Sequence, residues 1–155
     1  NNNGPFVIRY EKINIKYDYS KASLLKIGSW SKIKNGNDAT IITYGSFVNK
    51  ASDIIDEVGK DIGIVNARFI KPFDSEMFGE IVKLNKPIFV IEESMKIGSL
   101  ASHLALEIQK YNTRSKIIPI SINDEFLTHA SRDELLNMTN LDNESIIKII
   151  RDTLK

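Results

Sequence analysis

Hydrophobic and polar positions follow two different periods along most of the chain. Compact apolar runs at residues 39–44, 62–65, 88–91 and 117–122 have the length and the β-branched content of strands buried on both faces. Between these runs, apolar residues recur every three or four positions, as on one face of a helix. The pattern therefore predicts strands that alternate with helices.

Start and stop signals set the limits of the predicted helices. The first helix ends at Gly59, the second is capped by Asp74 or Ser75 and broken at Pro87, and the third follows Gly98. Two more helices are expected, a short one capped by Ser131 or Asp133 and a last amphipathic one over 143–154. Strands alternating with helices of this length indicate βαβ units. The predicted fold class is α/β, a three-layer sandwich with a mostly parallel central sheet of about five strands and helices on both faces.

The first part of the chain follows a different pattern. Residues 5–10 are apolar and rich in β-formers after Pro5, which predicts a short strand. Residues 24–27 and 30–33 are two short apolar pieces around Gly28 and Ser29, which predicts a hairpin. A dense turn signal at 35–38 separates this part from the regular alternation.

Composition and charge exclude several classes of function. The 155 residues are 42% apolar and 26% charged, as expected for one globular domain, and the net charge of +1 gives no case for binding nucleic acid or an anionic membrane. The absence of cysteine excludes a disulfide framework, a thiolate zinc site and a cysteine nucleophile. No apolar run approaches the ~20 residues that span a bilayer.

Polar residues follow three of the predicted strands, where open α/β sheets usually bind ligands. Ser46 comes after a single glycine, which is too little for a phosphate-binding loop. Arg68 and Lys71 could together hold an anion, but we expect Arg68 to pair with a carboxylate such as Asp74. Glu92 and Glu93 are adjacent in a strand, so their side chains should point to opposite faces and not act as a catalytic pair.

The two histidines leave one question open. His103 lies within a predicted helix, where a surface or boundary position is the usual one. His129 precedes a helix start, and with Arg132 it could contact an anion or a partner, or simply belong to a loop whose polar groups are satisfied locally. No nucleophile, base and orienting residue come together, and no metal-binding set can be assembled. The sequence predicts no catalytic, cofactor-binding or metal-binding residue, so any chemistry would be completed by residues outside these 155.

Several segments together resemble one family. They are Thr43–Ser46, Val65–Asp74, Val90–Glu93 followed by Gly98, and His129–Leu135, and in this order and spacing they are similar to the C-terminal domain of 1-deoxy-D-xylulose-5-phosphate synthase. The segment Arg68–Asp74 is shared in looser form with other transketolase-like enzymes, and the segment His129–Leu135 points to the synthase. The resemblance covers roughly residues 5–154.

The resemblance implies a reaction and a division of the chain. The family joins pyruvate to glyceraldehyde 3-phosphate with loss of carbon dioxide, using thiamine diphosphate and Mg²⁺ that two upstream domains bind. Residues 1–12 would then be the last strand of the preceding pyrimidine-binding domain, 13–37 a linker and hairpin, and 38–155 the transketolase C-terminal-like domain. This domain would be structural and would support a homodimer; alone it would be inactive.

One substrate contact is implied near the start of the chain. The family has an Arg-Tyr-Pro-Arg-Gly run whose second arginine resembles a ligand of the substrate phosphate, and this chain has Arg9-Tyr10-Glu11-Lys12. Lys12, with Arg9, would then contact the phosphate, although a lysine binds as a point charge and not as a two-pronged fork. A second departure is Ser99, where the family tends to have a glycine.

Two other identities remain alternatives. The chain could be the equivalent domain of a 2-oxo acid dehydrogenase E1 β subunit, or a free-standing interaction or regulatory domain. The expected partners are the upstream domains of the same chain and a second subunit, with no nucleic acid and no membrane. The 25 Ile and 14 Asn reflect adenine- and thymine-rich codons; with this pathway they suggest a plastid-type organelle in a eukaryote, and otherwise a cytoplasmic location.

Overall fold

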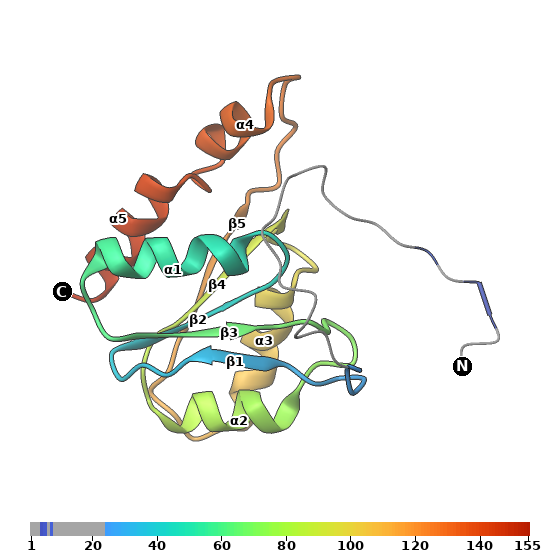
Figure 1. Cartoon of the computed structure of the whole chain (residues 1–155), viewed down its shortest axis with the longest axis vertical. Helices are drawn as coiled ribbons and strands as arrows, with labels where there is room; N and C mark the ends of the chain where they lie inside the picture. Colours follow the sequence, from blue (N-terminus) through green and yellow to red (C-terminus); the bar gives the residue numbers. More distant parts are fainter. Residues whose placement is uncertain (1–3, 6, 8–23) are drawn as a thin grey trace.

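A five-stranded sheet in the order β1-β3-β2-β4-β5 forms the centre of the molecule (Figure 1). The computed structural model describes residues 4, 5, 7 and 24–155. Strands β2 to β5 are parallel, and β1 lies antiparallel to β3 at one edge. The strands are β1 (Ser31–Lys34), β2 (Ala39–Thr43), β3 (Ile62–Asn66), β4 (Ile88–Met95) and β5 (Ile117–Ile122).

Strand β2 is the central strand, and all five of its residues are buried. Its apolar side chains point to both faces, which explains why the run lacks the alternation of a half-exposed strand. Thr43 pairs with Asn66 of β3 and with Ile91 of β4. The parallel strands therefore end at one common side of the sheet, which we call the carboxyl end.

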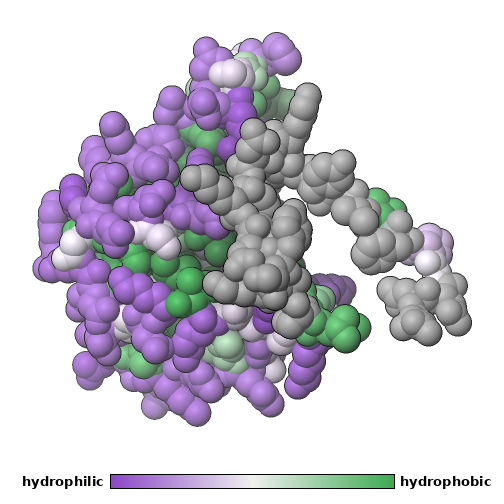
Figure 2. Space-filling view, viewed as in Figure 1, coloured by the Kyte–Doolittle hydropathy of each residue, from purple (hydrophilic) through white to green (hydrophobic). Residues whose placement is uncertain are grey.

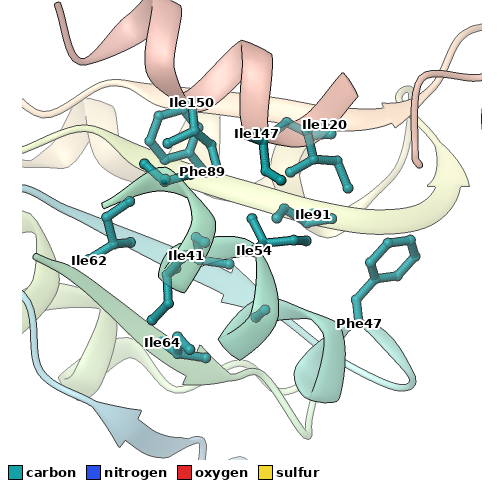
Figure 3. Packing of buried hydrophobic residues seen from close by; sticks show 14 of the residues in the cluster. Ile41, Phe47, Ile54, Ile62, Ile64, Phe89, Ile91, Ile120, Ile147 and Ile150 are labelled. Carbon is teal, nitrogen blue, oxygen red and sulfur yellow. The ribbon is translucent and has the colours of Figure 1, made fainter. Parts of the chain in front are cut away.

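Helices α1 (Phe47–Val58) and α5 (Asn143–Thr153) cover one face of the sheet (Figure 1). The apolar stripe of α1 packs on β2 and β3 and against α5, and Figure 3 shows Ile54 between Ile41, Ile91 and Ile147. Ile54 and Ile150 are fully buried, and each such side chain stabilises the fold by roughly 1.5–3 kcal/mol relative to exposure. The short helix α4 (Arg132–Met138) precedes α5 and adds Leu136 to this core.

Helices α2 (Ser75–Lys83) and α3 (Leu100–Glu107) cover the other face, and a 3₁₀ turn (Ile108–Lys110) extends α3. Their core is partly aromatic: Phe73 packs edge-on against Phe78 at 6.1 Å and against His103 at 4.8 Å between ring centroids. The sheet thus separates two apolar cores. The predicted three-layer α/β sandwich is confirmed.

Side-chain caps fix where the helices begin. Asp74 accepts a hydrogen bond from Met77 N at 3.0 Å, and Asp142 accepts one from Ser145 N at 2.9 Å. Ser131, and not Asp133, caps α4 in a capping box with Glu134. The predicted caps are therefore confirmed at α2, by Asp74, and at α4, by Ser131, whereas the cap of α5, Asp142, was not predicted.

The predicted hairpin around Gly28 and Ser29 is wrong. Residues 24–27 form no strand, and β1 pairs instead with β3, with Ser31 opposite Asn66. Trp30 explains the difference: its backbone N–H donates to Asp74 Oδ2 at 2.8 Å and its indole N–H donates to Phe69 O at 2.8 Å, so the residues before β1 are held by the loop after β3.

The expected division of the chain stays a prediction. The segment expected as linker and hairpin, 13–37, contains β1, which belongs to the five-stranded sheet. The strand predicted over residues 5–10 lies outside the described residues apart from positions 5 and 7, and those two are in no strand.

A close backbone contact joins the loop after β1 to the start of β3. A Cβ atom built on Gly36 would lie 2.0 Å from Gly63 N, and one built on Gly63 would lie 3.1 Å from Gly36 N. A side chain at position 36 would push the loop between β1 and β2 away from the start of β3. Because β3 lies between β1 and β2 in the sheet, this loop must cross the start of β3, and glycine at position 36 lets it cross closely.

Within the described part of the chain, no helix has the length and apolar character needed to cross a bilayer.

Candidate functional site

The carboxyl end of the sheet brings together the polar residues that follow the strands. Loops 44–46, 67–74, 96–99 and 123–131 all leave the sheet here, because β2 to β5 run in the same direction. Their side chains form two groups, one around Glu92 and one around Arg132.

Glu92 is a buried carboxylate, 1% exposed, that binds the first turn of α3. Its Oε1 accepts a hydrogen bond from Ala101 N at 2.9 Å, and its Oε2 accepts one from Leu100 N at 3.2 Å and one from Tyr44 Oη at 3.0 Å. The first N–H groups of a helix have no partner within the helix and carry a partial positive charge. Glu92 supplies both the acceptors and the negative charge, so it fixes α3 to the end of β4.

Tyr44 completes this group from the end of β2. Burial raises the pKa of the Tyr44 hydroxyl from 10.0 to about 12, and the neighbouring Glu92 carboxylate adds to the rise because a second negative charge beside it is unfavourable. The hydroxyl therefore stays protonated and donates to Glu92 throughout the neutral range, and it is not available as a base.

Arg132 forms the second group, on the opposite face of the sheet. Its guanidinium Nη2 donates to Glu93 Oε2 at 2.6 Å and to Ser46 Oγ at 3.3 Å. The Arg132 and Glu93 side chains are 32% and 34% exposed, so the pair is partly screened by water. It ties the first turn of α4 to β4 and to the N-cap of α1.

The two adjacent glutamates thus bind helices in different layers. Glu92 contacts α3 and Glu93 contacts α4, which confirms the expectation that consecutive strand residues point to opposite faces. They cannot share a proton or act on one substrate atom as a pair.

Arg68 does not pair with Asp74 as the sequence suggested. Its Nη2 donates to Trp30 O at 2.9 Å and to Ser29 Oγ at 3.4 Å, while the Asp74 oxygens accept from Trp30 N and Met77 N. Arg68 and Asp74 therefore hold the same segment, residues 29–30, from two sides. Lys71 is exposed in the same loop.

The anion or partner contact expected of His129 and Arg132 stays a prediction. His129 is exposed, and Arg132 contacts Glu93 and Ser46. His103 is an exposed residue in the first turn of α3 whose ring packs on Phe73. Arg9 and Lys12 lie outside the described residues, so their proposed contact with a phosphate stays a prediction.

Three contributors were missed from the sequence. Tyr44 and Ser46 were seen only as flanks of a weak phosphate-loop candidate, and Ser99 only as a substituted glycine. Ser99 caps α3 by accepting a hydrogen bond from Ser102 N at 3.3 Å. The signal that could have identified Ser99 is its position directly before a helical apolar stripe, which is where serine caps occur.

The described residues contain no cluster of side chains of the kind that holds a metal ion such as Mg²⁺. No group of three or more histidine, cysteine, aspartate or glutamate side chains in this part of the chain could hold a metal ion. The carboxylates at the carboxyl end already bind helix N–H groups or Arg132. The described contacts at the carboxyl end orient helices and loops relative to the sheet.

Comparison with curated proteins gives the same family as the motifs. The 1-deoxy-D-xylulose-5-phosphate synthase of Thermotoga maritima is 33% identical over 158 residues, which cover 98% of this chain and 25% of that protein. The synthases of Bacillus licheniformis and Clostridium tetani are 33% and 30% identical, over 96% and 93% of this chain and 24% of each relative. The chain thus spans about a quarter of the length of these relatives.

Solved structures and a family model agree on the fold. A chain described as "Split gene transketolase, inactive beta4 tetramer" has a TM-score of 0.75 at 24% identity, over 84% of this chain and 44% of that one. Transketolase from Leishmania mexicana has a TM-score of 0.61 at 14% identity, over 81% of this chain and 18% of that one. The model of the transketolase C-terminal domain matches residues 28–146. The chain therefore belongs to the transketolase C-terminal domain family.

Proposed function

We propose that this chain is the C-terminal domain of a 1-deoxy-D-xylulose-5-phosphate synthase. The longer protein would join pyruvate to glyceraldehyde 3-phosphate, release carbon dioxide and form 1-deoxyxylulose 5-phosphate, an isoprenoid precursor. The observation that carries the proposal is the match at 30–33% identity over nearly the whole chain to synthases from several bacteria. The segment His129–Leu135, which suggested the synthase over the dehydrogenase β subunit, includes the capping box that begins α4.

The role proposed for this domain is architectural. Thiamine diphosphate and Mg²⁺ would be bound by the upstream domains of the longer protein, as the resemblance implies, and among the described residues no group of three or more possible metal ligands comes together. Glu92 and Arg132 would hold α3 and α4 so that the loops at the carboxyl end have one fixed shape. A homodimer, with this domain supporting it, is part of the same proposal.

The residues before the described fold carry the one proposed substrate contact. Lys12, together with Arg9, would bind the phosphate of glyceraldehyde 3-phosphate in the longer enzyme. The support is the resemblance of Arg9-Tyr10-Glu11-Lys12 to the family's arginine-containing run. A plastid-type location in a eukaryote, or the cytoplasm of a bacterium, is proposed on composition and pathway alone.

Turnover of pyruvate and glyceraldehyde 3-phosphate tests the proposal directly. The full-length gene product and the present chain are each assayed with thiamine diphosphate and Mg²⁺, and 1-deoxyxylulose 5-phosphate is measured. We expect activity in the full-length product and none in this chain. Activity in neither protein would contradict the synthase assignment, and activity in this chain alone would contradict the architectural role.

A further inference from the structure

The loop between β1 and β2 contains an asparagine followed directly by a glycine, Asn35 and Gly36. Asparagine is among the thermolabile residues. In this dipeptide the backbone nitrogen of the glycine can attack the side-chain amide carbon of the asparagine, because the glycine has no side chain to hinder the approach. Asn35 is exposed and lies in neither a helix nor a strand. The loop therefore carries the groups needed for a spontaneous change of its own backbone.

The fold requires the glycine of this pair. A Cβ atom built on Gly36 would lie 2.0 Å from Gly63 N, 2.3 Å from the carbonyl carbon of Ile62 and 2.8 Å from Asp61 O. All three are backbone atoms at or just before the start of β3, so no side chain could turn aside to make room. The reactive dipeptide is thus a consequence of the close crossing of this loop over β3.

The loop has little slack on either side of the crossing. Before it, Lys34 pairs with Ile64 in the sheet. After it, Asp61 Oδ2 accepts hydrogen bonds from Asn37 N at 3.1 Å and from Asn37 Nδ2 at 2.7 Å, and Asp38 N donates to Asp61 O at 2.8 Å. An additional backbone atom between these two fixed points cannot be accommodated unless one set of contacts breaks.

We propose that Asn35 is a site of spontaneous deamidation and that its isoaspartyl product releases β1 from the sheet. Gly36 N gives up its proton and bonds to the side-chain carbon of Asn35, while the amide nitrogen leaves as ammonia, and a succinimide ring closes. Water then opens the ring at one of its two carbonyl groups. One product is aspartate. The other is isoaspartate, in which the backbone runs through the side-chain carbon and is longer by one methylene group.

The two products separate the effect of charge from that of backbone length, since both carry the same new carboxylate. Asn35 is exposed, so water and salt screen this charge. Lys32 and Lys34 line the same groove and attract it, although Lys32 also pairs with Glu80 at 3.4 Å. Aspartate therefore leaves β1 in place. Isoaspartate lengthens the backbone at the crossing and forces β1 away from β3.

Release of β1 would uncover one edge of β3 (Figure 1). The side chains of Ile62, Ile64 and Val65 in β3 are at most 1% exposed, whereas most of the visible surface of the molecule is hydrophilic (Figure 2). An uncovered apolar strand edge is a template for pairing with another chain. Because the ammonia is lost, the modification would act as a one-way timer that converts the domain to a form prone to association.

Hydrogen exchange followed by mass spectrometry on the aged full-length protein tests both parts of the proposal. The protein is kept for several weeks at neutral pH and exchanged, and peptides that span residues 31–38 are then analysed. The asparagine, aspartate and isoaspartate forms of this peptide elute separately, so exchange in β1 is measured for each form in one sample. Asn3 also precedes a glycine and serves as an internal comparison; it lies outside the described residues, and a Cβ on Gly4 would meet no atom within 4 Å.

The matched variant is Asn35→Gln. It keeps an amide at this position, but its longer side chain would have to close a larger ring, which forms far more slowly. We expect this variant to stay unmodified on ageing and to keep the protection of β1.

In the unchanged sequence we expect both products at Asn35, and β1 amides that exchange about tenfold faster in the isoaspartate form than in the asparagine and aspartate forms. If Asn35 stays unmodified, the proposal is overturned, and conversion of Asn3 in the same sample would identify protection by the fold as the reason. Equal exchange in the three forms would overturn the release of β1. Loss of protection in aged Asn35→Gln would assign that release to another cause.

Discussion

Replacing Glu92 with glutamine is expected to destabilise the domain substantially with almost no change in shape. The carboxylate is 1% exposed and accepts three hydrogen bonds, from Leu100 N, Ala101 N and Tyr44 Oη. Glutamine keeps one acceptor oxygen, so its NH₂ group must face at least one of these donors. The loss therefore has two sources, one unsatisfied buried N–H group and the missing negative charge at the start of α3.

The magnitude follows from these two sources. An unsatisfied buried donor costs about 1–3 kcal/mol, and the charge at the helix N-terminus contributes about 0.3–2 kcal/mol. A neutral amide is easier to bury than a carboxylate, which offsets part of the sum. We expect the free energy of unfolding to fall by about 2–4 kcal/mol, a large share of the ~5–15 kcal/mol typical of a domain.

Urea unfolding followed by tryptophan fluorescence measures this change. Trp30 is the one tryptophan of the sequence and is 3% exposed, so its emission reports unfolding of the core that α3 helps to form. With a slope of about 1–3 kcal/mol per molar urea, the midpoint should move down by roughly 1–2 M.

The matched control is the adjacent residue in the same strand. Glu93→Gln removes the charge that faces Arg132, but this pair is about one-third exposed and should cost less than about 1 kcal/mol. If Glu92→Gln unfolds at the same urea concentration as the unchanged chain, or if Glu93→Gln shifts the midpoint as far, the account of Glu92 as the anchor of α3 is refuted.

Four further outcomes are expected. The pKa of Tyr44 is raised to about 12, so the stability linked to its proton is complete below pH 10 and is lost as the pH rises toward 12. Between pH 10 and pH 12 the melting temperature of Tyr44→Phe should therefore fall less than that of the unchanged chain, and equal falls would contradict the linkage. Burial acts to raise the pKa of Asp142, but hydrogen bonds from Ser145 outweigh the burial and the pKa is lowered. Asp142 caps α5, so Asp142→Ala should lower the free energy of unfolding in urea by about 1 kcal/mol and Asp142→Asn by much less; equal losses would argue against a cap. Gly36→Ala places a Cβ 2.0 Å from Gly63 N and should lower the melting temperature far more than Gly59→Ala, where no atom lies within 4 Å and only the positive φ is strained. In the full-length enzyme, Lys12→Ala should raise KM for glyceraldehyde 3-phosphate while Lys12→Arg keeps it near the original value, and an unchanged KM in Lys12→Ala would exclude the phosphate contact.

Local patterns were sufficient for most of the fold. The strands β2 to β5 are short β-branched runs, and the helices combine an apolar stripe with a cap such as Asp74 or Ser131, so local preference and tertiary packing agree.

Pairings between distant residues could not be predicted in the same way. The two apolar pieces around Gly28 indicated a local hairpin, but the first piece stays outside the sheet and β1 pairs with β3 some thirty residues later in the chain. Nothing near Trp30 in the sequence shows that Asp74 and Phe69 will bind it.

The candidate site shows the same division. Strand alternation predicted that Glu92 and Glu93 would diverge, because that depends on the backbone alone. It could not predict that Glu92 would bind the start of α3, since this depends on the turn at Gly98, or that Arg132 would reach Glu93 and Ser46 across the end of the sheet.

The antiparallel strand β1 has a practical consequence for how the protein can be attached or labelled. Because β1 runs against the other strands, it starts at the carboxyl end of the sheet, whereas α5 finishes at the opposite end, where Arg151 donates to Glu57 O in the last turn of α1 (Figure 1). A tag or surface linkage placed after Lys155 would therefore stand a full strand length away from the loops around Phe126. Immobilisation through a group placed after Lys155 should leave those loops accessible to solution.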